Sequence, residues 1–251
     1  MSPQKEYSIA ENILHMIREN SQFTEEEAKI LDLALLLHAE HGGGNNSAFT
    51  CRVLTSSGTD TYSAISGAIN ALKGPKHGGA NIQVVRMMRN IEKHVENLND
   101  EEEIYNYLVK IIKREAFDRS GLIYGMGHAV YTKSDPRGEI LRNYAMDLAY
   151  KTGNEEKFKL YQTVEKLTPQ VFAKYKDDKK VISANIDFYS GFVYGMLNIP
   201  SDLYTPLFAI ARIAGWCAHR MEELISGGRI LRPAYKSICK NEKEFVEMKD
   251  R

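Results

Sequence analysis

A glycine-rich segment that carries one histidine and one arginine is the clearest chemical signal in this sequence. Gly-Met-Gly-His-Ala-Val-Tyr occupies 125–131 and Asp-Pro-Arg occupies 135–137, so His128 stands nine residues before Arg137. A histidine donates a hydrogen bond or a proton to a carbonyl oxygen. An arginine fork grips a carboxylate through two parallel hydrogen bonds. Together they predict a pocket for a small oxo-acid, with Pro136 fixing a turn before the arginine.

Two further clusters supply groups for acid–base work. His77 lies in the glycine-rich run 73–81, just before a predicted helix whose positive end favours the neutral imidazole. A neutral imidazole can donate to a developing enolate, although a capping or turn histidine is the alternative. Asp187 stands among apolar and aromatic neighbours at 186–189, where burial would raise the pKa of its carboxyl and make it a better base. An aspartate is also a good helix N-cap, and the two roles are compatible.

Arg212 interrupts an apolar helical pattern over 207–216, where a charge is costly unless it is paired. Its partner is either a substrate carboxylate or an internal Asp or Glu. Arg232 precedes a proline and is by itself typical of a surface charge.

His38 and His41 share a helix face at i and i+3, a spacing that metal ligands also use. No cysteine or acidic ligand motif accompanies them, so the sequence predicts no metal site. We expect one histidine of the pair to be buried and the other to point into the pocket.

Composition excludes several classes of function. The 251 residues include 33 Lys and Arg and 33 Asp and Glu, a formal net charge of zero. Nucleic-acid binding normally leaves a basic excess, so we expect no nucleic-acid partner. No apolar run approaches the roughly 20 residues of a membrane span, and residues 1–7 lack the apolar core of a secretion signal. Three cysteines without paired spacing favour a reducing cytoplasm.

The chain shows helical periodicity nearly throughout, with no alternating strand pattern, so the sequence predicts an all-α fold. Ser8-x-x-Glu11 and Thr24-x-x-Glu27 are capping boxes, each before an apolar run. Further helices are expected over 62–72, 81–98, 100–113, 139–152, 155–167, 169–176, 186–197 and 205–225.

Details of this pattern carry their own expectations. The helix over 62–72 is rich in small residues and should lie close against a partner helix. Thr205 should cap the last helix, with Pro206 at its first position. A glycine-rich loop is expected over 117–137, and a charged turn over 177–180.

Taken in order, these clusters resemble citrate synthases. The matching segments are 38–41 with the Gly/Asn turn that follows, 74–81, 125–137, 185–191, Arg212 and Arg232-Pro233. The resemblance spans nearly the whole chain and implies a citrate synthase-like fold, in which part of a large helical domain and a smaller helical domain close over substrate. It assigns 1–80 to the first part of the large domain, 81–200 to the small domain and 201–251 to the large-domain return helix and tail.

The resemblance implies condensation of oxaloacetate with acetyl-CoA, followed by hydrolysis of the thioester to citrate and CoA. Asp187 would remove a proton from the acetyl methyl, and His77 would hydrogen-bond the enol oxygen. His128 would polarise the oxaloacetate carbonyl and protonate the new alkoxide. No permanently bound cofactor is implied, because CoA is substrate and product.

Binding residues follow from the same resemblance. Oxaloacetate would be held by His41, Arg137 and Arg212, while Arg232 would reach into the neighbouring subunit's site. The CoA adenine would lie against the backbone from about 122 to 127, which includes Leu122, Gly125, Met126 and Gly127.

Two alternatives stay open. One is a 2-methylcitrate synthase that uses propionyl-CoA, because one extra methyl is worth only about 1–3 kcal/mol of discrimination. The other is an inactive fragment or split-enzyme component, because family members carry a long helical region before the segment that matches Ser8. Apolar faces at 28–37 and 62–72 would then be exposed, favouring a homodimer or a complex with the missing N-terminal segment.

Overall fold

A computed structural model describes residues 2–128, 131, 133–176, 182–234, 236, 238 and 245–250 of the protein. Within these residues every regular element is a helix, which confirms the predicted all-α class. The α-helices are α1 (Ile9–Ile17), α2 (Glu25–His38), α3 (Asn46–Ser56), α4 (Thr61–Leu72), α5 (Ala80–His94), α6 (Glu101–Ile112), α7 (Pro136–Thr152), α8 (Glu155–Tyr175), α9 (Ile186–Met196) and α10 (Tyr204–Ile225). Two 3₁₀ turns, η1 (Ser201–Leu203) and η2 (Met248–Asp250), complete the described elements. None of the described helices is both long and apolar enough to cross a bilayer.

Both predicted capping boxes are present. The Ser8 hydroxyl accepts from the Glu11 backbone N–H at 3.2 Å, and the Glu11 carboxylate accepts from the Ser8 N–H at 2.7 Å. Thr24 and Glu27 repeat this arrangement at the start of α2. Each box satisfies two backbone donors that the first helical turn leaves unpaired.

The predicted close approach of the helix rich in small residues is confirmed, and its partner is a helix that the sequence pattern did not reveal. A Cβ atom on Gly67 of α4 would lie 2.1 Å from Leu54 Cδ1 of α3, so any larger residue at this crossing would displace the Leu54 side chain. The α3 segment has little apolar periodicity, because its buried face is made of small and polar residues such as Ser47, Ala48 and Thr55. That composition explains why α3 was missed.

Three helix boundaries differ from prediction. α8 is one helix that continues through Pro169, because residues on both sides of the proline stay in the core. α7 begins at Pro136, since Asp135 caps it and proline suits the first helical position. Thr205 does not cap α10; its hydroxyl donates to the Gly78 carbonyl at 2.9 Å, so a tertiary contact replaced the expected local one.

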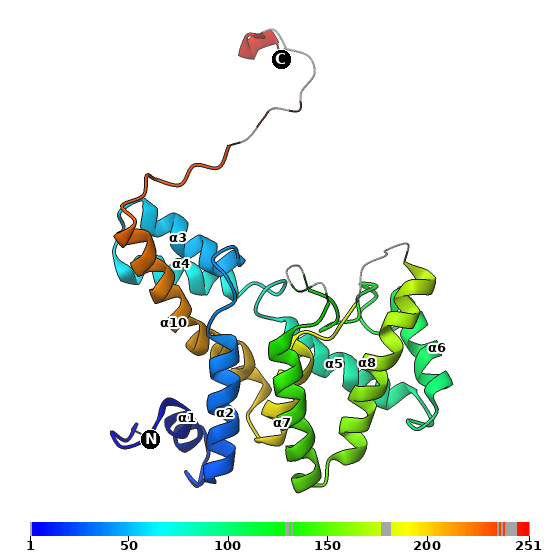
Figure 1. Cartoon of the computed structure of the whole chain (residues 1–251). Coiled ribbons are helices and arrows are strands. Elements are labelled where there is room, and N and C mark those ends of the chain that lie inside the picture. The colour runs from blue at the N-terminus through cyan, green and yellow to red at the C-terminus, as the bar shows by residue number, and fades with distance from the viewer. Residues whose placement is uncertain are drawn as a thin grey trace.

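The core has two hydrophobic clusters joined by α10. The larger cluster draws on α1, α2 and the helices from α5 to α10. The smaller one packs α3 and α4 against Phe208 and Trp216 of α10. Figure 1 shows α10 passing from the α3–α4 pair, past the upper end of α2, toward the remaining helices. The domain boundaries at 80 and 200 remain a prediction.

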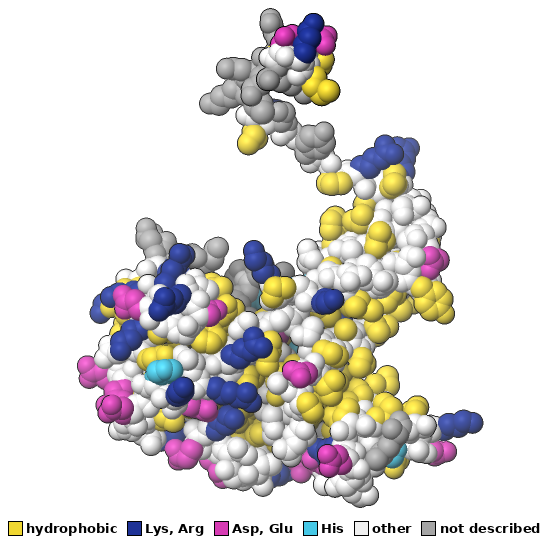
Figure 2. Space-filling view, turned by 180° about the vertical axis from the view of Figure 1, so that it is seen from behind, with side chains coloured by type: hydrophobic (Ala, Val, Ile, Leu, Met, Phe, Trp, Pro, Cys, Tyr) yellow, Lys and Arg dark blue, Asp and Glu magenta, His cyan; other side chains and the backbone are white. Residues whose placement is uncertain are grey.

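Parts of both predicted apolar faces are solvent-exposed. Leu36 of α2 and Tyr62 of α4 are 68% and 89% exposed, and Ile225 at the end of α10 is 86% exposed. Figure 2 shows hydrophobic side chains gathered along one side of the molecule, seen from behind. The charged turn over 177–180 and Cys239 lie outside the described residues, while Cys51 and Cys217 are free thiols.

Candidate active site

The predicted histidines at 41 and 128 lie together, although 87 positions separate them in the sequence. Their ring centroids are 5.1 Å apart, and the Tyr131 ring lies 4.8 Å from His128 and 6.4 Å from His41. His41 follows the end of α2, whereas His128 and Tyr131 belong to the loop before α7. Burial, then the charges of Arg137 and Arg212, lower the pKa of His41 to about 4, so this imidazole is neutral near pH 7.

Arg137 stands in the first turn of α7 and already has an internal partner. Its Nε and one terminal nitrogen donate to the two Asp135 carboxylate oxygens at 3.0 and 2.8 Å. Asp135 also accepts from the Ile186 backbone N–H at 3.2 Å, which ties the start of α7 to the start of α9. The guanidinium carbon lies 5.2 Å from the Tyr131 ring centre. Arg137 is therefore fixed in orientation beside the histidine pair.

Arg212 is buried in the middle of α10 and is only partly satisfied. Its Nε donates to the His38 carbonyl at 2.6 Å, while both terminal nitrogens are buried without a hydrogen-bond partner among the described residues. The guanidinium carbon lies 4.9 Å from the Phe208 ring centre. Burial lowers the pKa of Arg212 to about 10, so the group stays charged at neutral pH. Among the described residues no Asp or Glu forms an ion pair with Arg212, and Glu40 pairs with His219 at 2.9 Å.

Asp187 lies in the first turn of α9, where Asn185 rather than Asp187 is the N-cap. The Asn185 side chain accepts from the Asp187 backbone N–H at 3.0 Å, so the predicted capping role of Asp187 is wrong. The Asp187 carboxyl is therefore not engaged in capping α9. Burial raises the pKa of Asp187 to about 6, and Arg137 and Arg212 oppose this rise. The carboxylate therefore lies in the field of both arginines and can exchange a proton near neutral pH.

His77 lies in the loop before α5, as predicted. Its Nε2 is 2.9 Å from the Ser47 hydroxyl, and its ring packs edge-on against Phe208 at 6.1 Å. Ser47 also accepts from Trp216 Nε1 at 3.2 Å, which anchors the hydroxyl. Burial, followed by the Arg212 charge, lowers the pKa of His77, so the predicted neutral imidazole agrees with its surroundings.

The segment predicted to line the CoA adenine runs alongside the start of α9. Asn185 N–H donates to the Gly125 carbonyl at 2.9 Å, and Gly127 N–H donates to the Ser183 carbonyl at 2.7 Å. Met126 forms an isolated antiparallel bridge with Ala184. Gly125 has a φ of +76°, and a Cβ there would lie 2.9 Å from the Phe188 backbone, so glycine is required. Leu122 is 48% exposed at the outer end of this segment.

Arg232 is the one predicted site residue that this chain does not bring to the cluster. It is exposed in the extended segment after α10, and Figure 1 shows that segment leading away from the helices. Arg232 therefore lies on the surface of the single chain, as its sequence context predicted.

His38 and His41 have the different surroundings that the sequence predicts, one buried and the other beside the second pocket histidine. His38 is 1% exposed and its Nδ1 lies 2.7 Å from the Ala34 carbonyl, whereas His41 faces His128. Among the described residues, no group of three or more His, Cys, Asp or Glu side chains is placed to hold a metal ion.

Sequence reasoning missed four supporting residues of the cluster. Tyr131 contacts both pocket histidines, Asp135 orients Arg137, Ser47 contacts His77 and the His38 backbone orients Arg212. Asp135 alone had a local signal, because an Asp before a Pro is typical of a helix start. The other contacts join distant segments, and no spacing in the sequence encodes them.

The fold and the cluster define an all-helical protein with histidines, arginines and one aspartate gathered from distant segments around one site. The sequence profile of the citrate synthase C-terminal domain matches residues 1–234. The chain therefore belongs to the citrate synthase family.

Individual relatives agree with this assignment. The whole chain is 38% identical to a citrate synthase of Deinococcus radiodurans and covers 61% of it. It is 32% identical to 2-methylcitrate synthase 2 of Corynebacterium glutamicum, again covering 61%. A structure of Thermoplasma acidophilum citrate synthase with carboxymethyl-CoA and oxaloacetate matches 99% of this chain and 61% of its own, with 28% identity and a TM-score of 0.77. The chain thus spans about three fifths of the length of these relatives.

Proposed function

We propose that the chain carries the active site of a citrate synthase, which condenses oxaloacetate with acetyl-CoA and hydrolyses the thioester to citrate and CoA. The observation that carries this proposal is the Arg212 guanidinium, buried with both terminal nitrogens unpartnered in the described structure. An unpaired buried charge is costly, and a carboxylate of the substrate supplies the missing partner. The relatives' names and the oxaloacetate in one related structure support the same substrate.

Oxaloacetate binding follows from the polarity of the cluster. Arg212 offers two free nitrogens to one carboxylate, and Arg137, which Asp135 holds and whose charge acts on His41 together with that of Arg212, would bind the other. His41 is neutral and donates a hydrogen bond without adding a third positive charge. His128 lies next to it, in position to polarise the carbonyl and then to protonate the alkoxide.

Asp187 is the proposed base that removes a proton from the acetyl methyl. A thioester methyl is far less acidic than a carboxylic acid, and each unit of pKa mismatch costs about 1.4 kcal/mol. His77 lowers this cost by donating a hydrogen bond to the enolate oxygen as its charge develops. This role requires the imidazole proton to reside on Nδ1, so Ser47 must donate its one proton to Nε2 of His77 and not to Asn45 Oδ1, which lies 2.9 Å from the same hydroxyl. The nucleophilic enol carbon attacks the oxaloacetate carbonyl, and water hydrolyses the thioester afterwards.

The test is release of free thiol from acetyl-CoA with oxaloacetate, using the chain alone and the chain with an N-terminal segment from a relative. Asp187→Asn should lower kcat about 10³-fold, the scale of general-base catalysis, and leave oxaloacetate affinity within a few fold. Asp202→Asn, an exposed acid near α10, is the matched control. A near-normal rate for Asp187→Asn would overturn the base assignment.

The pH profile gives an independent check. Because the pKa of Asp187 is raised to about 6, kcat/KM should rise tenfold per pH unit below pH 6 and level off above it. If kcat/KM instead levels off above about pH 4, the Asp187 carboxyl is not desolvated to the extent that the structure indicates.

A second candidate function is a 2-methylcitrate synthase, favoured by the 32% identity to the Corynebacterium glutamicum enzyme of that name. The two thioesters differ by one methyl group, which is worth only about 1–3 kcal/mol of discrimination. Comparing kcat/KM for acetyl-CoA and propionyl-CoA decides between them, and a preference for propionyl-CoA rejects the first choice.

We also propose that two copies of the chain pair through the exposed apolar side chains of α2, α4 and α10, with Arg232 reaching the partner's site, in a reducing cytoplasm. Light scattering at micromolar concentration tests the dimer. If Arg232 completes the partner's site, Arg232→Gln raises the KM for substrate while the dimer mass is unchanged.

A further inference from the structure

A cavity at the opposite end of α9 from Asp187 has the composition of an anion site. Its volume is about 390 Å³, and residues of α5, α7, α8, α9 and the start of α10 line it. The lining residue of α9 nearest to Asp187 is Gly191, one helical turn or about 6 Å along the axis, and none of His41, His77, His128, Arg137, Asp187 or Arg212 lines the cavity. The cavity and the cluster around Arg212 are therefore two different sites.

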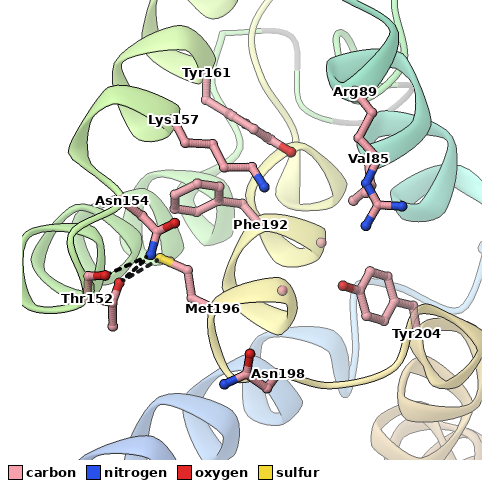
Figure 3. Close-up of a pocket in the computed structure, with 12 residues that line it drawn as sticks. Val85, Arg89, Thr152, Asn154, Lys157, Tyr161, Phe192, Met196, Asn198 and Tyr204 are labelled. Carbon is pink, nitrogen blue, oxygen red and sulfur yellow. Dashed lines mark hydrogen bonds between the residues drawn. The ribbon is translucent and has the colours of Figure 1, made fainter. Parts of the chain in front are cut away.

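Two cations enter this cavity from separate helices. Arg89 comes from α5 and Lys157 from the first turn of α8, and Figure 3 shows both charged ends directed into the same space. Neither makes an ion pair or hydrogen bond with another side chain in the described structure. No Asp or Glu stands among the described residues that line the cavity. Two like charges that converge without a counter-ion leave a site of positive potential.

Neutral donors complete the arrangement. The Tyr204 hydroxyl at the start of α10 points into the cavity in Figure 3, with the Arg89 guanidinium above it and the Asn198 amide below. Burial raises the pKa of Tyr204 while the Arg89 charge opposes the rise, so the phenol keeps its proton and can donate it. Asn154 is held in place at the rim by donating to the Thr152 hydroxyl at 2.9 Å.

We propose that this cavity binds a compact multivalent oxyanion of the phosphate class, with Arg89 and Lys157 gripping its charged groups from opposite sides. An arginine fork suits two phosphate oxygens, and a lysine acts as a point charge on a third. The volume exceeds that of one phosphate group, so a diphosphate or an organic phosphate is the expected size of ligand. This inference does not depend on the reaction proposed for the Asp187 cluster.

The test is isothermal titration of the chain with pyrophosphate and with inorganic phosphate, at constant ionic strength set by sodium chloride. Pyrophosphate should bind at one site and more tightly than phosphate, because it reaches both cations. Arg89→Gln and Lys157→Gln should each weaken pyrophosphate binding about tenfold or more, the value of one charge-assisted hydrogen bond. Lys110→Gln removes an exposed charge of α6 that does not line the cavity, and should leave the affinity unchanged.

Two further variants separate this site from the Arg212 cluster and from general charge effects. A Cβ on Gly195 would meet only the Tyr204 hydroxyl, at 3.7 Å, so Gly195→Ala fits while Gly195→Leu extends into the cavity. Gly195→Leu should abolish binding with every charge retained, and Gly195→Ala should preserve it. Arg212→Gln should also preserve it.

Three results would overturn the proposal. The first is loss of pyrophosphate binding in Arg212→Gln but not in Arg89→Gln. The second is a Lys110→Gln variant that weakens pyrophosphate binding as much as Arg89→Gln does. The third is the absence of saturable pyrophosphate binding by the wild-type chain.

Discussion

Two buried arginines on one helix, Arg212 and Arg220, have opposite surroundings. Arg220 is 8% exposed and donates to the Thr61 hydroxyl at 3.2 Å, the Thr55 hydroxyl at 3.0 Å and the Thr59 carbonyl at 2.9 Å. Arg212 is 1% exposed, and among the described residues it donates only through Nε and leaves its two terminal nitrogens unpartnered.

The difference separates an arginine that holds the fold from one whose terminal nitrogens are available to the proposed substrate. Arg220 fastens the second half of α10 to the α3–α4 connection, and its hydrogen bonds offset the cost of burying its charge. Arg212 carries that cost without full compensation inside the described chain. Both arginines are buried, so burial alone does not distinguish them. The difference lies in how many guanidinium nitrogens have a hydrogen-bond partner.

The largest expected effect is on substrate binding at Arg212. Arg212→Met should raise the Kd for oxaloacetate about 10²–10³-fold, because it removes a desolvated charge partner. It should not lower the free energy of unfolding, since a partly unsatisfied buried charge is replaced by an apolar side chain. Calorimetric titration and urea unfolding measure the two quantities. A loss of stability as large as that of Arg220→Met would break the comparison.

Arg220→Met should show the reverse pattern. Its three hydrogen bonds disappear and the buried Thr55 hydroxyl loses its donor, so the free energy of unfolding should fall by about 2–4 kcal/mol. Oxaloacetate affinity of the folded variant should stay within about threefold, because Arg220 lies two turns beyond Arg212. Lys29→Met, which removes an exposed ion pair with Glu25 on α2, is a control expected to cost less than about 1 kcal/mol.

A smaller effect concerns acid stability. Burial and nearby arginine charges lower the pKa of His38 and His41 from 6.5 to about 4. Between those values the unfolded chain binds protons that the folded chain rejects, so this contribution to stability is present above pH 6.5 and is lost as pH falls through 4.

Arg212→Met removes one of those charges and should let the pKa of both histidines rise toward 6.5. The stability lost between pH 7 and pH 5 should then shrink by about 0.5–1 kcal/mol, whereas Arg220→Met should leave the pH dependence unchanged. The raised pKa of Asp187, which Arg212 opposes, changes in the same direction. Urea unfolding at pH 7 and pH 5 measures this loss of stability. The same loss in the wild-type chain, Arg212→Met and Arg220→Met would contradict the prediction.

Local signals in the sequence were enough for much of the fold. The capping boxes at Ser8 and Thr24 form because a side chain and a backbone three residues away need no help from the rest of the protein. The helix over 186–197 was found within one residue, from its apolar pattern. In contrast α3 and the continuous α8 were missed, because packing overrode weak periodicity in one and a proline in the other.

The sequence by itself determined the kinds of groups available and their order along the chain, from His41 to Arg212, since residue chemistry and helical period are local properties. Only the tertiary structure decided which of these groups were left unsatisfied. Asp135 accepts hydrogen bonds from Arg137, and Asn185 caps α9 in place of Asp187. The His38 carbonyl accepts from one nitrogen of Arg212, and the other two have no partner among the described residues. Such outcomes depend on distances between remote segments and on exclusion of water, and spacing along a chain specifies neither.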